Sequence, residues 1–239
     1  MASSIERQQS GKAEKEKEMR ILVCSCDKNN DLFYPFYKCM EKYYPNHPEV
    51  IYSTETVTNP YYRTICKNYP LDQWSRRIRE TLAMISDDHI LVMVDDAFIR
   101  APVDEKRIGY AEKSLAGDVA CVNFEREYDP LNDDTPWTWI TGFKKRRPGS
   151  PWCVSIMCGL WDREKLIDVL RDDMDPWAIE IWQPTRGYTY LINGGDYIID
   201  YGYRNMQYMG IHNGKWCREV VPFFEKEGIV VDYSERGFN

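Results

Sequence analysis

The sequence feature that most constrains the fold is an apolar run that ends in two aspartates. Residues 89–96 read His-Ile-Leu-Val-Met-Val-Asp-Asp. A short run rich in apolar residues between polar flanks is typical of a strand buried on both faces, as in the middle of a parallel sheet. Because burying an unpaired carboxylate is costly, we expect Asp95 and Asp96 where the strand leaves the core, at its carboxyl end. That edge is where ligands bind in open α/β sheets.

A carboxylate pair at such an edge suits Mg²⁺ or Mn²⁺. Both are hard cations that prefer oxygen ligands and accept phosphate oxygens as co-ligands. The alternative is that the two aspartates form a helix N-cap or a loop turn after a core strand. The run therefore predicts a buried strand and a candidate metal site at Asp95 and Asp96.

Composition limits the class of protein. The 239 residues include 43% hydrophobic and 29% charged side chains, which is ordinary for a globular protein. The net charge of −7 argues against duplex nucleic acid as the main partner, since binding phosphates favours a basic surface. The eight cysteines show no C-x-x-C spacing, and the N-terminus has no apolar leader, so we expect reduced thiols in a cytoplasmic protein. No run reaches the roughly 20 apolar residues of a membrane span, so any attachment to the inner membrane face is expected to be peripheral or through a partner.

The order of the predicted elements indicates an α/β fold. Residues 1–18 are polar and are expected to form a solvated tail ahead of a single domain over 19–239. Apolar periodicity then predicts β-α-β-α-β, with strands at 21–26, 50–54 and 90–94 and helices at 32–44 and 72–85. This order predicts a mostly parallel central sheet with right-handed crossovers and helices on both faces.

The remaining residues continue the pattern. We predict irregular structure over 55–70, a helix from 102–104 to about 115 and a strand at 118–124. A long loop at 125–147 and an apolar run at 152–161 follow. Further helices are predicted at 163–171, from 175 and at 222–228, and short strands at 197–199 and 208–212. Residues 19–124 form the expected nucleotide-binding half, and residues 125–239 form the half for the second substrate.

Several short motifs follow one another along residues 19–216. They are the opening strand with Cys24 to Asp27, Leu71 to Ile78, Asp95 to Phe98, Cys158 to Asp162, Asp175 to Glu180, and Gly214 to Trp216. In this order they resemble motifs of small bacterial and phage-type glycosyltransferases of the GT-A fold, which is Rossmann-like. The adjacent aspartates depart from the commonest form of the metal motif in that family, Asp-x-Asp.

The resemblance implies an enzyme that moves a sugar from a nucleotide-diphosphate sugar, foremost a UDP-sugar, to a glycan or other hydroxyl acceptor in polysaccharide biosynthesis. Mn²⁺ or Mg²⁺ would neutralise the leaving diphosphate. Asp96 is the first choice as metal ligand, and Asp95 would hold the metal, its water or the donor ribose. His212 is the third ligand that the resemblance implies, with an exposed turn histidine as the alternative.

The donor would lie over the ends of the first two strands. Ser25 and Asp27 are candidates for contact with the base or ribose, as are Ser53 and Glu55. Ser75 and Arg79 lie four residues apart, on one face of a helix, and are expected to reach the ribose or the diphosphate. The alternative for the three arginines of this helix is a solvated face; these are Arg76, Arg77 and Arg79.

The acceptor hydroxyl needs a general base, for which Glu180 is the choice and Asp162 and Asp196 are competitors. A surface helix glutamate is the alternative for Glu180. Four tryptophans could form stacking surfaces for acceptor sugars, namely Trp137, Trp139, Trp177 and Trp182.

Three other functions remain open. A glycosyltransferase acting on modified DNA bases would use the basic residues 144–147 to grip phosphate. A non-catalytic GT-A-like module would bind a nucleotide or glycan without turnover. A nucleotidyltransferase usually carries a glycine-rich phosphate loop near its first strand, and residues 24–31 contain no glycine.

Overall fold

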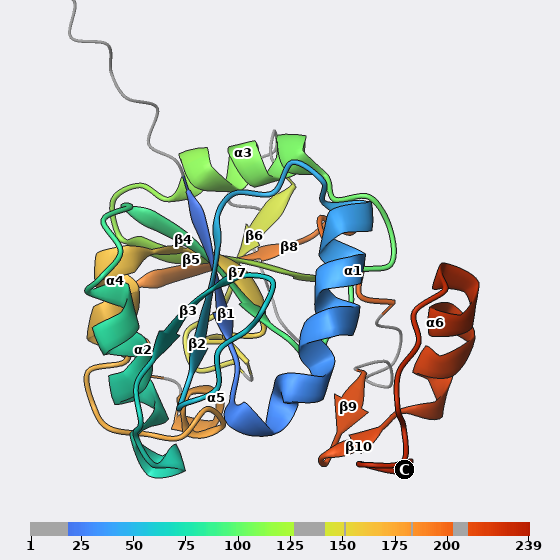
Figure 1. Cartoon of the computed structure of the whole chain (residues 1–239). Coiled ribbons are helices and arrows are strands. Elements are labelled where there is room, and N and C mark those ends of the chain that lie inside the picture. The colour runs from blue at the N-terminus through green and yellow to red at the C-terminus, as the bar shows by residue number, and fades with distance from the viewer. Residues whose placement is uncertain (1–18, 127–141, 151, 183, 203–209) are drawn as a thin grey trace, which may run out of the picture.

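One sheet of eight strands organises the domain. The computed structural model describes residues 19–126, 142–150, 152–182, 184–202 and 210–239, so the predicted tail at 1–18 lies outside the described residues. The strand order is β3-β2-β1-β4-β7-β5-β8-β6 (Figure 1). The sheet joins both predicted halves, since β5 of the first half lies between β7 and β8 of the second, and it forms a single α/β domain.

Most of the sheet is parallel, as the sequence predicts. Six strands run in one direction, and they are β1 (Arg20–Cys24), β2 (Val50–Thr54), β3 (Arg63–Cys66), β4 (His89–Val94), β5 (Val119–Arg126) and β8 (Thr189–Asn193). Two run the opposite way, namely β7 (Cys158–Asp162), between β4 and β5, and β6 (Phe143–Lys145), beside β8. The predicted strands at 21–26, 50–54 and 90–94 are therefore confirmed as adjacent parallel strands.

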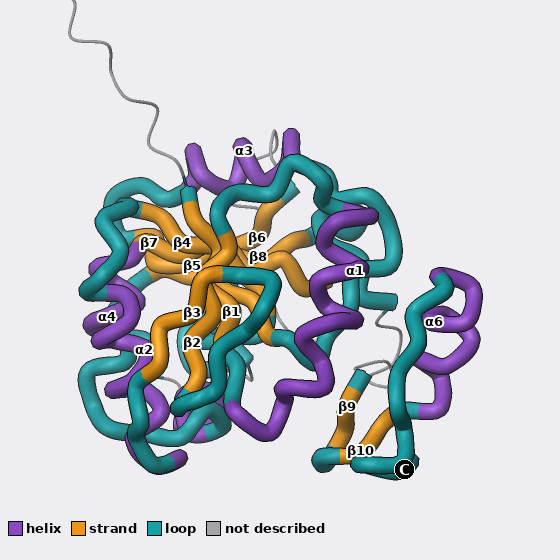
Figure 2. Tube along the Cα trace, viewed as in Figure 1, coloured by secondary structure: helices purple, strands orange, loops and turns teal. Residues whose placement is uncertain are grey.

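Helices cover both faces of the sheet (Figure 2). Side chains alternate along a strand, so Ile21 and Val23 of β1 pack with one set of helices and Leu22 with the other. The first set is α1 (Phe33–Tyr43), α3 (Glu105–Ser114) and α6 (Val221–Glu227). The second set is α2 (Trp74–Leu82), α4 (Arg163–Val169) and α5 (Ala178–Trp182).

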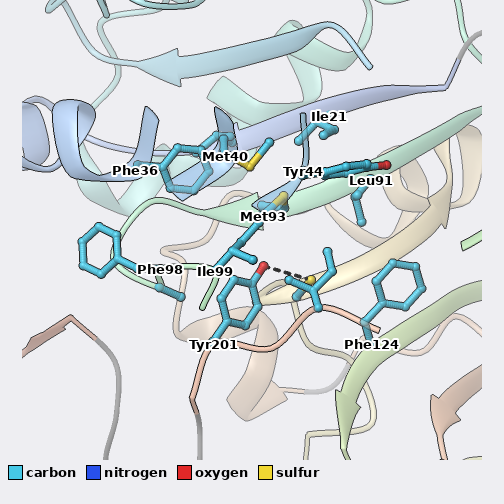
Figure 3. Close-up of a cluster of buried hydrophobic side chains, with 14 of the residues drawn as sticks. Ile21, Phe36, Met40, Tyr44, Leu91, Met93, Phe98, Ile99, Phe124 and Tyr201 are labelled. Atoms are coloured by element: carbon cyan, nitrogen blue, oxygen red, sulfur yellow. Dashed lines mark hydrogen bonds between the residues drawn. The ribbon is translucent and has the colours of Figure 1, made fainter. Parts of the chain in front are cut away.

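Short elements complete the domain. Three 3-10 helices, η1 (Asp27–Leu32), η2 (Leu71–Gln73) and η3 (Arg218–Val220), precede α1, α2 and α6. A small antiparallel ribbon, β9 (Ile211–His212) with β10 (Lys215–Trp216), lies beside α6 (Figure 1). Under β4, Met93 packs with Ile99 and Tyr201, and the Tyr201 hydroxyl lies 3.2 Å from Cys158 Sγ (Figure 3).

Two caps predicted from sequence are confirmed. Asp162 accepts a hydrogen bond from the Lys165 amide at the start of α4. Asp175 accepts from the amides of Trp177 and Ala178 where α5 begins. Both carboxylates satisfy amides that have no partner within the helix. All eight cysteines are free thiols, and six of them are buried.

The structure corrects four predictions of secondary structure. Residues 143–145, within the predicted loop at 125–147, form strand β6. Residues 63–66, predicted as irregular, form the edge strand β3, in which only Ile65 is buried. Residues 189–193 form the fully buried strand β8, which the sequence analysis did not predict. Residues 197–199 are not a strand, because their backbone bonds the loop after β4: the Ile198 carbonyl accepts from the Asp104 amide. Within the described ranges, no helix combines the length and apolarity needed to cross a membrane.

Candidate functional site

The carboxyl ends of the parallel strands meet at one edge of the sheet, which faces the bottom of Figure 1. Polar side chains gather at this edge where β1, β2, β4 and β5 end. Buried polar groups require hydrogen-bond partners, so their contacts show which side chains act as one unit.

Asp95 lies fully inside this edge, directly after β4. Its carboxylate accepts hydrogen bonds from Ser25 Oγ, at the end of β1, and from Asn29 Nδ2 of η1, at 2.9 Å. Loss of solvent, and then the neighbouring charge of Asp96, raise the pKa of Asp95 to about 7, against the lowering effect of these two bonds. Two of the predicted residues, Ser25 and Asp95, are therefore in direct contact.

Asp96 has different hydrogen-bond contacts from Asp95. Its Oδ1 is buried without a hydrogen-bond partner, and burial raises the pKa of Asp96 to about 6. The backbone carbonyl of Asp96 accepts from the Gly210 amide at 2.7 Å, which fixes the chain directly after β4. A buried carboxylate oxygen with no partner beside a second carboxylate is a donor set that suits a hard divalent cation.

A buried arginine joins the ends of β1 and β2. Arg77 of α2 is 1% exposed, with Nη1 2.5 Å from Glu55 Oε1 and Nη2 2.6 Å from the Ser25 carbonyl oxygen. Glu55 also accepts from the Asp27 amide at 2.6 Å, and Asp27 in turn accepts from Thr56. The predicted residues Asp27 and Glu55 thus hold the loop after β2 against the loop after β1.

The alternative of a solvated helix face does not hold for Arg77, whereas the side chain of Arg76 is about half exposed. A signal for this was present in the sequence. Arg77 follows Trp74 by three residues and precedes Thr81 by four, so it shares their inward stripe. An arginine on such a stripe indicates a buried partner for its charge.

Three other candidates face away from this network. Ser53 is fully buried and bonds Thr81 Oγ1 at 3.1 Å. Ser75 is fully buried and exchanges hydrogen bonds with the backbone of residues 172 and 174. Arg79 binds the Arg171 carbonyl and Asp173. Ser75 and Arg79 share a face, as predicted, but that face attaches α2 to the 171–174 loop.

A second group of carboxylates lies at the same edge. Ser155 Oγ is 2.9 Å from Glu180 Oε1 and 3.4 Å from Glu125 Oε2. Withdrawal from solvent raises the pKa of Glu180, and withdrawal from solvent followed by the charge of Glu180 raises the pKa of Glu125 to about 7. The sequence analysis missed Glu125, although it follows the strand at 118–124 much as the aspartates follow theirs.

The strand register relates the two groups. Met93 of β4 pairs with Cys158 of β7, and Asn123 of β5 pairs with Gly159. Glu125 of β5 therefore lies at the same height in the sheet as Val94 of β4, the residue immediately before Asp95. Because β7 separates β4 from β5, the two groups lie two strand spacings apart, which is roughly 10 Å.

A segment far along the chain covers η1. Arg236 binds Asp31 with two nitrogens, at 2.5 and 2.7 Å, and also bonds the Lys28 carbonyl and Asn29 Oδ1. The side-chain amide nitrogen of Asn29 in turn donates a hydrogen bond to Asp95. Residues that are more than 200 positions apart thus orient one carboxylate.

The other candidates lie outside these groups. His212 is exposed on β9, and its carbonyl accepts from Asn239. Among the described residues, no three His, Cys, Asp or Glu side chains stand ready to hold a metal together, so His212 is not assembled with the two aspartates. Trp177 and Trp182 of the acceptor set are 60% and 65% exposed, and Trp137 and Trp139 lie outside the described residues.

The competing bases and the basic run have structural contacts. Asp162 caps α4 and pairs with Lys165, and the Asp196 carbonyl accepts from Arg107 and Asn193. In the basic run, Arg146 is 6% exposed and bonds the Trp152 carbonyl at 2.5 Å. A surface that grips phosphate through all four residues of the run is therefore absent.

No protein-family model and no curated protein matches this chain. Among solved structures, the 2-C-methyl-D-erythritol 4-phosphate cytidylyltransferase of Thermus thermophilus is 10% identical with a TM-score of 0.49, over 89% of this chain and 100% of that one. TarS of S. aureus is 8% identical with a TM-score of 0.47, over 75% and 36% of the two chains. The bifunctional IspDF of Campylobacter jejuni is 11% identical with a TM-score of 0.42, over 79% and 52%. The chain thus spans about half the length of IspDF and about a third of TarS. These likenesses are remote, with identities of 8 to 11% and TM-scores below 0.5.

Proposed function

We propose that the protein transfers a sugar from a nucleotide-diphosphate sugar, foremost a UDP-sugar, to a hydroxyl group of a glycan or similar acceptor in polysaccharide biosynthesis. The observation that carries this proposal is the pair of carboxylate groups at one sheet edge. Asp95 and Asp96 lie after β4, and Glu180 lies against Ser155, roughly 10 Å along the sheet. One group suits a cation and the other suits a proton acceptor.

The aspartates form the donor end of this site. Asp96, with its unpartnered Oδ1, and Asp95 would hold Mn²⁺ or Mg²⁺. Such a cation supplies positive charge to the leaving diphosphate. Ser25 and Asn29 orient Asp95, and Arg77 fixes the loops after β1 and β2 on which the nucleotide would rest. His212 becomes a ligand only if β9 brings its ring toward Asp96.

Glu180 is the proton acceptor of the proposed reaction. The acceptor oxygen forms a bond to the anomeric carbon while the bond from that carbon to the diphosphate oxygen breaks, and the electron pair leaves with the diphosphate. The hydroxyl proton passes to the Glu180 carboxylate. Trp177, directly before α5, and Trp182, at its last residue, are exposed and offer apolar faces to an acceptor sugar.

The proposal is tested by thermal shift and donor turnover with a panel of nucleotide-sugars, with and without Mn²⁺. A ligand that binds the folded state raises the melting temperature. We expect a Mn²⁺-dependent shift that Asp96→Asn removes and that Glu180→Gln retains. Turnover should fall by about 10²-fold or more in Glu180→Gln, the scale of a lost general base.

The matched controls are Asp72→Asn and Glu164→Gln, both on exposed helical positions, which should behave as wild type. Wild-type turnover in both site variants would remove the assigned roles. A nucleotide-dependent shift with no turnover of any donor would leave a binding module in place of an enzyme.

A further inference from the structure

The side chains of Glu125, Ser155 and Glu180 lie close together. When both carboxyls are ionised, neither has a hydrogen to donate, and the serine hydroxyl has a single hydrogen for the two contacts. Ser155 has one hydroxyl hydrogen and lies between two carboxyl groups, 2.9 Å from Glu180 and 3.4 Å from Glu125. That hydrogen can be donated to only one of them. If it goes to Glu180, Glu125 Oε2 keeps a long contact with Asn123 Nδ2, at 3.4 Å, and faces the serine oxygen, an arrangement that a proton on Glu125 stabilises.

The surroundings favour one negative charge rather than two. Both carboxyls are withdrawn from solvent, and each repels the ionised form of the other. Arg146, directly after β6, faces Glu125 and favours its ionised form, but the loss of solvent and the charge of Glu180 outweigh this effect and raise the pKa of Glu125. Among the residues that the structure describes, the other titratable groups that interact with Glu125 are thiols and a phenol that stay neutral, namely Cys121, Cys158 and Tyr201.

We propose that Glu125 and Glu180 share one proton through Ser155, with Glu125 as the protonated member at neutral pH. Glu125 then donates to Ser155 Oγ, and the Ser155 hydroxyl donates to Glu180, across the shorter of the two distances. Glu180 stays ionised and oriented. This inference rests on the proposed function in one respect only, the use of Glu180 as proton acceptor.

Glu125 and Ser155 are therefore positioning residues. When the acceptor hydroxyl gives its proton to Glu180, Glu125 keeps its own proton, and the serine hydroxyl remains directed at Glu180. No oxidant or further reactant is needed, because the only transfer is that of the hydroxyl proton. Without a protonated group at position 125, the Met157 amide, 3.4 Å from Ser155 Oγ, would still contact the serine, but the serine hydroxyl would be directed at Glu180 less firmly.

The test is infrared spectroscopy of the carboxyl C=O band, measured on the whole folded protein between pH 5 and 9. We expect a protonated carboxyl that titrates at about pH 7, as the pKa of Glu125 indicates. Asp95 also has a pKa raised to about 7, so the band is assigned by difference. It should disappear in Glu125→Gln and persist in Asp95→Asn and in the exposed control Glu164→Gln.

A second measurement follows turnover. Glu125→Ala removes the donor to Ser155 and should lower kcat by about tenfold with little change in the donor KM. Glu125→Gln supplies an amide donor and should restore most of that loss. If Glu125 had a structural role only, the kcat values of the alanine and glutamine variants would instead follow their melting temperatures.

The outcomes separate the two proposals. If no carboxyl band is lost in Glu125→Gln, proton sharing is overturned whether or not the protein turns over a donor. If the band is present and assigned to Glu125 while no donor is consumed, proton sharing stands and the proposed function fails. If Glu125→Ala does not fold, Glu125→Gln with the infrared band still decides.

Discussion

Arg77 and Glu55 form an ion pair at 2.5 Å between helix α2 and the loop after β2, and the guanidinium is almost fully buried. The same guanidinium holds the Ser25 carbonyl at 2.6 Å. Arg77 thereby connects the helix to two strand ends that border the candidate donor site. Its charge has a structural role in the site even though it contacts neither aspartate.

Replacing Arg77 should be costly. Arg77→Ala removes the cation that pairs with Glu55 and the donor to the Ser25 carbonyl, and we expect the free energy of unfolding to fall by about 3 kcal/mol. Urea denaturation measures this. Arg76→Ala, one position away on the exposed face, is the control and should change stability by less than about 0.5 kcal/mol. Equal effects of the two changes would contradict the buried ion pair.

The metal-free protein should lose stability as the pH rises. The folded-state pKa of Asp95, about 7, lies above the ordinary aspartate value of 3.8, so the folded state binds more protons than the unfolded state between these values. Stability is then greatest at the acid end of this window and falls as the pH rises through it. We expect a loss of about 2 kcal/mol between pH 5 and pH 8 in the presence of a chelator.

Asp95→Asn should flatten that pH dependence. Glu125 contributes a fall of the same sign, so a smaller slope should remain. The exposed Asp72→Asn is the matched control and should keep the full slope. A wild-type protein that is more stable at pH 8 than at pH 5 would show that the two aspartates are already ionised without a metal.

Arg236 should control the order of η1. Arg236→Ala removes the contacts with Asp31, Lys28 and Asn29, and Asn29 is the residue that donates to Asp95. We expect amide hydrogen exchange over residues 27–32 to become about tenfold faster and the affinity for the donor to fall. Arg171→Ala, whose side chain is 60% exposed, should change neither. Unchanged exchange in Arg236→Ala would show that η1 is held by its other contacts.

Gly210 should tolerate no side chain. A Cβ at this position would lie 2.0 Å from Phe98 Cε2 and 3.0 Å from the Asp96 carbonyl oxygen, and Phe98 is 1% exposed. We expect Gly210→Ala to destabilise the fold by about 2 kcal/mol or more. Gly109→Ala is the matched control, because nothing lies within 4 Å of its Cβ and alanine favours the helix. It should be neutral or stabilising.

The double change Gly210→Ala with Phe98→Leu checks the cause. A smaller side chain at position 98 makes room for the added methyl group, so part of the loss should be recovered. No recovery would place the strain at the Asp96 carbonyl instead.

The elements that sequence reasoning found are those in which one physical signal dominates. Strands β1, β2 and β4 are continuous apolar runs because both faces are covered by helices. Strand β3 was missed because it lies at the sheet edge and buries one side chain, Ile65, which leaves almost no pattern. Strand β8 was missed because its run of five buried residues includes Thr189 and Asn193, whose polar groups are satisfied only in the fold.

Part of the candidate site could also be predicted from the sequence. Ser25 and Asp95 are brought together, as expected from strands that end at one edge. Arg77, Glu125 and Arg236 were not predicted, because each depends on a partner far away in the chain, and sequence spacing carries no information on such pairs. Ser53 was assigned by its place at a strand end and Ser75 by its helix face shared with Arg79, but the direction of a side chain decides its contact. Ser53 bonds Thr81 of α2, and Ser75 bonds the backbone at residues 172 and 174.

The contact between Arg236 and Asp31 also has a consequence for synthesis of the protein. During translation the η1 segment leaves the ribosome early, while Arg236 leaves after every strand of the main sheet. Until then Asp31 and Asn29 lack their guanidinium partner, and the hydrogen bond that orients Asp95 is unsupported. A nascent chain can thus assemble its sheet while its acidic edge is still unfinished, so competence to bind a ligand should be acquired only after this segment has emerged.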